Sequence, residues 1–113
     1  MSSSDLQEIE LTIDRAKEMI KDGEAVERLL RNRDFKRLVV DGYFKDEAVR
    51  LAFLKSERQV LTDEKLEKIV DSNLKSIGFF KQYLEFISHQ ALQAKAALKE
   101  NEELREELLT ETL

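Results

Sequence analysis

His89 is the only histidine in the chain, and its nearest acidic neighbour at helical spacing is Glu85, four residues earlier. A metal centre or a general acid–base pair needs more partners than this, such as a second histidine or carboxylate three or four residues away. We therefore expect His89 to be a solvent-facing residue. The spacing predicts no catalytic residue and no metal ligand.

The many carboxylates lack the order that chemistry requires. Asp41 and Gly42 are not accompanied by the alternating oxygen ligands and terminal glutamate of a calcium loop. The sequence shows no glycine-rich phosphate loop and no nucleophile elbow. It has no cysteine, which removes thiolate chemistry, disulfides and cysteine-based metal sites. These observations predict a protein that is not an enzyme and that uses no cofactor.

A basic cluster is the remaining candidate for a binding site. Five basic residues within ten positions are opposed there only by Asp34: Arg28, Arg31, Arg33, Lys36 and Arg37. The functional interpretation is an anion or nucleic-acid patch, and the alternative is a solvated helix end. The net charge of −5 favours the alternative, because nucleic-acid binding depends on an excess of Lys and Arg. Pairing with the Glu-rich end of a neighbouring molecule is a third interpretation.

A ladder of mainly apolar residues at alternating spacings of four and three runs through the C-terminal half. Its members are Leu66, Val70, Asn73, Ile77, Phe80, Leu84, Ile87, Ala91, Ala94 and Leu98. This heptad rhythm keeps one stripe of a long α-helix apolar and requires partner helices to cover it. We expect one helix over residues 62–110, about 70 Å long, that ends in an acidic arm.

Shorter helices are predicted before the long one. A helix over residues 5–31 is expected to begin at Ser4 and to bend near Gly23. Asp34 is expected to cap a short turn that Asp41 and Gly42 end. A further helix is expected over residues 44–56. Residues 57–61 show no pattern, and Thr62 marks the start of the long helix.

Together these elements predict an all-α fold in one domain, residues 1–113. The absence of proline, three glycines and a charged fraction of 38% suit long helices. The helices of residues 5–61 are expected to form a small bundle around the base of the long helix. The arm beyond Gln90 has no evident partner within the chain, so another polypeptide is expected to cover it.

The stripe of the arm is therefore the predicted interface with a partner or a second copy: Ala91, Ala94, Leu98, Leu104 and Leu108. Asn73 and Asn101 lie on the heptad stripe of the long helix, where a polar residue can fix helix register at a cost in stability. Simple solvation of Asn73 is the alternative. A second stripe of Phe79, Tyr83 and Phe86 is expected to be bundle core between the first and third helices, with a partner-binding hot spot as the alternative.

Two segments, Asn32–Leu51 (NRDFKRLVVDGYFKDEAVRL) and Ile77–Tyr83 (IGFFKQY), resemble small helical proteins of tailed bacteriophages, as does the Glu-rich end. The resemblance extends from Ile9 to about Glu107. Its motifs are not catalytic, and it carries over no functional residue. It implies a phage accessory protein that is virion-associated or takes part in head assembly.

The function predicted from these observations is helix-mediated oligomerisation or docking on phage structural proteins. The alternative is a small acidic phage inhibitor that binds a host enzyme by charge complementarity. Nucleic acid is not an expected partner. No apolar run approaches the roughly 20 residues that cross a bilayer, and the first residues lack the pattern of a secretion signal. The host cytoplasm or the virion is thus the expected location.

Overall fold

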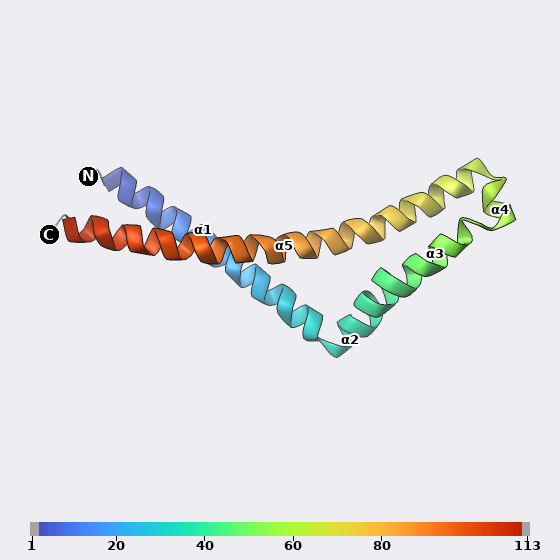
Figure 1. Cartoon of the computed structure of the whole chain (residues 1–113), viewed down its shortest axis with the longest axis horizontal. Coiled ribbons are helices and arrows are strands. Elements are labelled where there is room, and N and C mark those ends of the chain that lie inside the picture. The colour runs from blue at the N-terminus through green and yellow to red at the C-terminus, as the bar shows by residue number, and fades with distance from the viewer. Residues whose placement is uncertain (1–2, 112–113) are drawn as a thin grey trace. The chain divides into compact units, whose positions relative to one another are not determined.

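The computed structural model describes residues 3–111 (Figure 1). Every regular element in this range is a helix: α1 (Ser3–Arg31), α2 (Arg33–Phe35), the π-helix η1 (Lys36–Glu47), α3 (Ala48–Leu54), α4 (Arg58–Leu61) and α5 (Glu64–Glu111). The predicted all-α class with a long C-terminal helix is confirmed. The chain forms two compact units: unit 1 is Met1–Glu27 with Phe86–Leu113, and unit 2 is Arg28–Glu85. The two residues at each end of the predicted 1–113 domain lie outside the described residues.

Unit 1 is an antiparallel pair made by α1 and the C-terminal half of α5 (Figure 1). Residues 20–27 lie beside residues 88–95, and residues 5–9 lie beside residues 104–108. The apolar stripe of α1 is buried at Ile13, Ala16, Gly23 and Val26. The predicted packing of the first helix around the base of the long helix is therefore wrong, because α1 packs along the arm.

The ends of α1 agree with the helix dipole, since Asp5 lies in the first turn and Arg28 and Arg31 lie in the last turn. Ser4, the predicted start, lies inside the helix. Helix α1 is continuous through Gly23, which has no positive φ, so the bend predicted near this residue is not a break of the helix and stays a prediction. This glycine has a packing role at the α1–α5 contact.

Unit 2 contains a continuous helical run from Arg33 to Leu54, made of α2, η1 and α3. Asn32 caps it, since its side-chain oxygen accepts a hydrogen bond from the backbone N–H of Phe35 at 2.9 Å. The predicted cap, Asp34, lies instead in the first turn. The break predicted at Asp41 and Gly42 is also wrong, because the chain passes through both residues as a π-helix without a positive φ.

The π-helical turn suits the spacing of the apolar residues in this run. Four half-buried side chains follow one another at spacings of five, four and four residues: Phe35, Val40, Phe44 and Ala48. Hydrogen bonds from i to i+5 make the turn wider than an α-helical turn. An α-helical period starting at Phe35 would have turned Gly42 and Asp46 inward. Tertiary packing of Phe44 and Ala48 against the core thus overrides the local break signal.

The core of unit 2 joins α3, α4 and the N-terminal half of α5 through Leu51, Val60, Val70 and Ile77. The short helix α4 was not predicted, although its Val60 is only 2% exposed. Helix α5 begins one residue after Asp63, whose carboxylate accepts hydrogen bonds from the backbone N–H groups of residues 65 and 66. Asp63 is therefore the N-cap in place of the predicted Thr62.

The predicted heptad ladder is buried mainly at one of its two positions. Four of the five residues at this position are buried, namely Val70, Ile77, Leu84 and Ala91, and the fifth, Leu98, is half-buried. At the other position, Asn73 and Phe80 are exposed, whereas Ala94 is buried. The stripe is therefore narrow in unit 2 and wider in unit 1.

Candidate functional site

The predicted interface residues of the arm pack within the chain. Ala91, Ala94 and Leu108 are 6%, 5% and 5% exposed, because α1 of the same unit covers them. Leu98 is half-buried and Leu104 is exposed. The expectation that the arm lacks a partner within the chain is therefore wrong. A role of these residues between chains stays a prediction.

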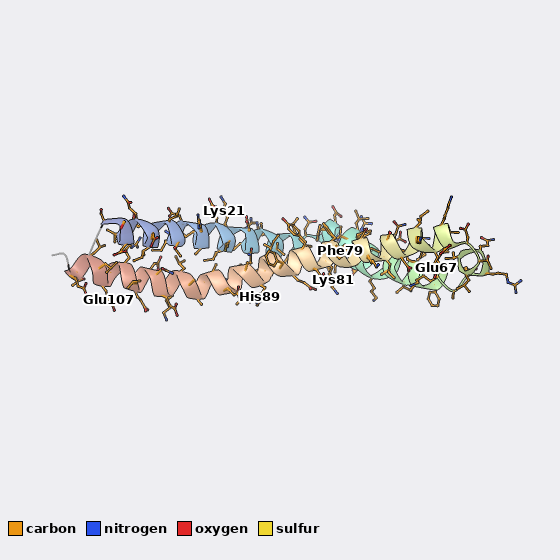
Figure 2. All side chains as sticks on the ribbon, turned by 90° about the horizontal axis from the view of Figure 1, so that it is seen from above. Lys21, Glu67, Phe79, Lys81, His89 and Glu107 are labelled. Atoms are coloured by element: carbon orange, nitrogen blue, oxygen red, sulfur yellow. The ribbon has the colours of Figure 1, made fainter. Side chains whose placement is uncertain are left out.

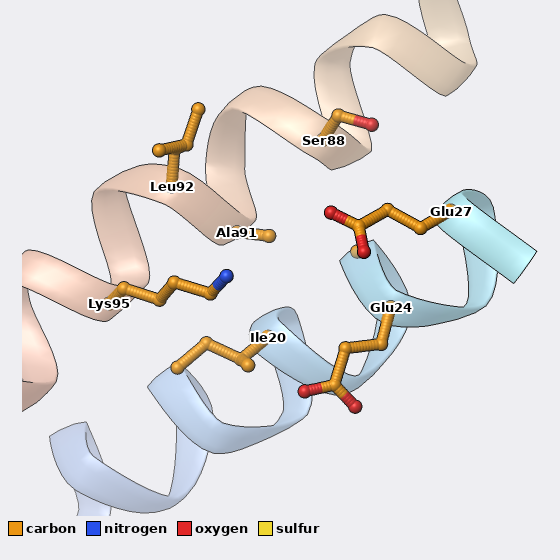
Figure 3. Close-up of a pocket in the computed structure, with 8 residues that line it drawn as sticks. Ile20, Glu24, Glu27, Ser88, Ala91, Leu92 and Lys95 are labelled. Carbon is orange, nitrogen blue, oxygen red and sulfur yellow. The ribbon is translucent and has the colours of Figure 1, made fainter.

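Close contact between α1 and α5 depends on Gly23 and Ala91. A Cβ atom added to Gly23 would overlap the Cβ of Ala91 and would lie 3.7 Å from its Cα. Figure 3 shows the methyl group of Ala91 directed toward α1 beside Ile20, while Leu92 points away. The hollow beside this contact has a volume of about 100 Å³. Ligand pockets are usually about 300 Å³ or larger, so we interpret this hollow as a by-product of small residues.

The basic cluster lies in unit 2, at the junction of two helices, and all five side chains are exposed. Arg28 and Arg31 end α1, where cations stabilise the helix dipole. Arg33, Lys36 and Arg37 begin the next helical run, where cations oppose the dipole. Arg37 forms a weak ion pair with Asp34 at 3.8 Å. Helix-end stabilisation therefore explains only the first two members.

The second aromatic stripe of α5 is uncovered. Phe79 and Tyr83 are 66% and 61% exposed, and Phe86 is also exposed, so its predicted place in a bundle core is wrong. Figure 2 labels Phe79 among the side chains of α5. Phe80 is different, because its ring contacts those of Tyr43 and Phe44 at centroid distances of 6.4 and 5.3 Å. Phe80 therefore packs against other aromatic rings of unit 2, whereas Phe79 and Tyr83 point into solvent.

The two stripe asparagines differ in their surroundings. Asn73 is exposed and lines a shallow hollow with Tyr43 and Glu47. The side-chain amide of Asn101 is half-buried and donates a hydrogen bond to the Ala97 carbonyl of its own helix at 2.7 Å. Neither side chain is placed here against a second chain. Their role in setting register stays a prediction.

His89, labelled in Figure 2, is exposed on α5, and Glu85 is exposed on the same helix. Within residues 3–111, no group of three or more His, Cys, Asp or Glu side chains lies close enough together to hold a metal ion.

Two ion pairs outside the basic cluster stabilise unit 2. Arg50 binds both carboxylate oxygens of Glu47, the longer hydrogen bond being 3.1 Å. This hydrogen bonding lowers the pKa of Glu47 below its usual value. Lys55 of the α3 end binds Asp71 of α5 at 2.7 Å, and the hydrogen bond raises the pKa of Lys55. Both pairs are solvent-accessible, so each contributes only modestly to the stability of unit 2.

Several exposed apolar side chains of unit 2 were not identified from the sequence. Phe53 at 71% and Leu61 at 61% exposed are the clearest. The available signal was their position off the face that carries Leu51 and Val60. With Phe79 and Tyr83, they are among the most exposed large hydrophobic side chains of unit 2.

Comparisons with protein-family models, with curated proteins and with solved structures find no match to this chain. None of the described helices combines the length and apolar character that a membrane span requires.

Proposed function

We propose that this protein is non-enzymatic and acts by helix-mediated association with other proteins. The observation that carries the proposal is the exposure of Ile69, Phe79 and Tyr83 on α5, which we call the aromatic face. Spacings of ten and four residues place the three side chains toward one side of the helix. Aromatic residues are enriched among the anchors of protein interfaces, where they fill pockets of the partner.

The aromatic face is large enough to matter in binding but too small to act alone. With almost two-thirds of each side chain exposed, Phe79 and Tyr83 offer roughly 250 Å² of surface, worth about 6 kcal/mol on full burial. Association itself costs at least about 4 kcal/mol. A stable interface usually buries more than about 1,000 Å² in total. The partner must therefore cover further parts of unit 2, such as the exposed Phe53.

The bacteriophage context comes from the resemblance of Asn32–Leu51 and Ile77–Tyr83 to phage helical proteins. In the structure both segments belong to unit 2, where Tyr43 and Phe44 contact Phe80. This supports reading the two segments as one structural feature. We accordingly propose an accessory or virion-associated protein of phage head assembly, whose partner is a phage structural protein.

The test is recovery of partners by the tagged protein from the cells that express it. The parent should recover capsid or tail components, and a Phe79→Ser/Tyr83→Ser variant should lose them. Leu92→Ser is the matched control, because Leu92 is 68% exposed but lies in unit 1. Circular dichroism should show that all three proteins are equally helical. Equal recovery by the parent and the aromatic variant would mean that the aromatic face is not the binding surface.

A second candidate, an acidic inhibitor of a host enzyme, is favoured by one observation. Glu103, Glu106 and Glu107 are exposed near the end of α5, and such a surface can occupy a basic channel by charge complementarity. Recovery of one host enzyme in stoichiometric amount, weakened by salt, would support this function. In that case Phe79→Ser/Tyr83→Ser should recover as much enzyme as the parent.

A further inference from the structure

The start of the helical run in unit 2 carries an excess of positive charge. Residues 28–37 hold five basic residues and one acidic residue, a formal charge of +4. Arg33, Lys36 and Arg37 are exposed in the first turns after the Asn32 cap. Cations at this end of a helix oppose the macrodipole. The pair of Arg37 with Asp34 is long, at 3.8 Å, and 68% and 81% of the two side chains are exposed.

The end of α5 carries the opposite excess. Residues 100–111, which we call the acidic arm, hold six glutamates and Arg105, a formal charge of −5. The last turn of α5 contains no basic residue, although cations are the charges that stabilise this end of a helix. Glu103 stands three and four residues before Glu106 and Glu107, spacings at which like charges repel along a helix. All three carboxylates are exposed.

We propose that the basic cluster of one copy of this chain binds the acidic arm of a second copy, head to tail. Arg33, Lys36 and Arg37 oppose the dipole of their own helical run, as the acidic arm opposes that of α5, and each patch supplies the charge that the other lacks. The pairing also brings the negative end of one helix to the positive end of another. A second copy is favoured over nucleic acid because the chain already carries a polyanion of matching charge.

A head-to-tail contact joins two different patches. Each copy can therefore bind one neighbour through its basic cluster and another through its acidic arm. Such contacts either close into a ring or continue as an open chain. The solution mass should therefore rise with protein concentration at low salt. It should fall toward the monomer at high salt, because the Debye length shrinks to about 3 Å at 1 M. This inference goes beyond the proposed function and does not depend on the aromatic face.

The experiment uses sedimentation velocity on two charge-reversed variants of the full chain. The first carries Arg33→Glu, Lys36→Glu and Arg37→Glu, and the second carries Glu103→Lys, Glu106→Lys and Glu107→Lys. Each variant alone should be a monomer, with a dissociation constant raised by more than about 100-fold, because like charges now face each other. An equimolar mixture should recover the salt-sensitive assembly. Recovery in the mixture requires pairing between copies.

A matched control separates position from net charge. Arg15→Glu, Lys17→Glu and Lys21→Glu change the charge by the same amount as the first variant, at exposed positions of α1. This control should assemble as the parent does. Circular dichroism should show that every variant is folded.

Two outcomes would overturn the proposal. One is a parent protein that stays monomeric at low salt over the full concentration range. The other is a mixture of the two variants that stays monomeric while the parent assembles. A salt-sensitive gel shift of DNA by the monomeric parent would assign the basic cluster to nucleic acid instead. Phe79→Ser/Tyr83→Ser should keep the salt-sensitive assembly, so failure of the proposed function and failure of this inference are distinguishable.

Discussion

The three glycines of the chain give a graded test of the structure when each is replaced by alanine. All three lie in helical segments without a positive φ. A gain in helix propensity of about 1 kcal/mol is therefore common to the three changes. The surroundings of the new methyl group differ. At Gly78 nothing lies within 4 Å, at Gly42 the Arg37 carbonyl oxygen lies 3.1 Å away, and at Gly23 the methyl group would overlap that of Ala91.

The cost at Gly23 follows from the rigidity of both partners. The Ala91 Cβ is fixed to its backbone, so the overlap is relieved only when α1 and α5 move apart. Such movement weakens the packing of the buried Ala16 and Ala94 along the same stripe. Overpacking of this kind costs about 1–3 kcal/mol. We therefore expect Gly23→Ala to change stability by between about zero and 2 kcal/mol in the destabilising direction, after the gain in propensity.

The comparison with Gly78 isolates the steric effect. Gly78→Ala should stabilise the protein by about 1 kcal/mol, because the propensity gain is unopposed. The difference between the two variants, about 1–3 kcal/mol, is the cost of the overlap itself. Gly42→Ala should fall between them, because the Arg37 carbonyl must shift by a small amount to admit the methyl group.

Urea unfolding followed by circular dichroism measures all three variants, since the chain has no tryptophan to report by fluorescence. Native-state hydrogen exchange should place the loss for Gly23→Ala in α1 and residues 86–111. Adding Ala91→Gly should restore part of the lost stability, and a double-mutant cycle gives the coupling. Equal stabilisation by Gly23→Ala and Gly78→Ala would refute the close contact between α1 and α5.

Three further predictions concern unit 2. Asn32→Ala should lower the free energy of unfolding by about 1 kcal/mol through loss of the cap, whereas Asn73→Ala, at an exposed position, should change it little; urea titration compares the two. Val60→Ala should cost about 2 kcal/mol if α4 belongs to the core, and an effect near zero would exclude α4 from it. The pKa of Glu47 lies below 4.5 because Arg50 hydrogen-bonds to its carboxylate, so its stabilising contribution is complete above pH 4.5 and is lost as the pH falls through the lowered pKa. Glu47→Gln lacks that contribution at every pH, so the difference in urea midpoint between the parent and this variant should shrink as the pH falls. A difference that stays constant with pH would contradict the ion pair.

Periodicity predicted part of the buried stripe of α5 but not which segment covers it. Ile77, Leu84 and Ala91 were placed on one stripe by spacing alone, and all three are buried. The covering helix of the arm was misjudged because α1 carries its own stripe at the same period, and that period fits any partner of similar length. The small residues Gly23 and Ala91 contained the missing signal. Two small residues on opposite helices favour close packing with each other.

Local rules failed where tertiary packing decided the backbone. Asp41 and Gly42 are typical of a helix end, yet the helical run continues through them as η1. A rule based on glycine alone does not take into account that Phe44 and Ala48 pack against the core. The wider turn of the π-helix η1 accompanies this packing. Helix caps were missed by one or two residues for a related reason. Asn32 and Asp63 were each close to the predicted cap residue, and the side-chain oxygen that reaches the free N–H groups depends on backbone geometry.

The remaining departures from local rules fall on the surface, where charged or aromatic side chains lie in surroundings that do not stabilise them. Natural sequences tend to be locally consistent with their folds, and inconsistencies concentrate at functional positions. In the interior, no buried side-chain nitrogen or oxygen among the described residues lacks a hydrogen-bond partner. On the surface, the cation of Lys36 lies near the positive end of a helix dipole and the carboxylate of Glu106 lies near the negative end of another. The side chain of Phe79 is exposed to water. Each of these three features would be corrected by contact with another macromolecule, the charged ones by opposite charge and the aromatic one by an apolar pocket. An isolated chain gains nothing from any of them, which is why we assign function to these surfaces and not to the hollows between the helices.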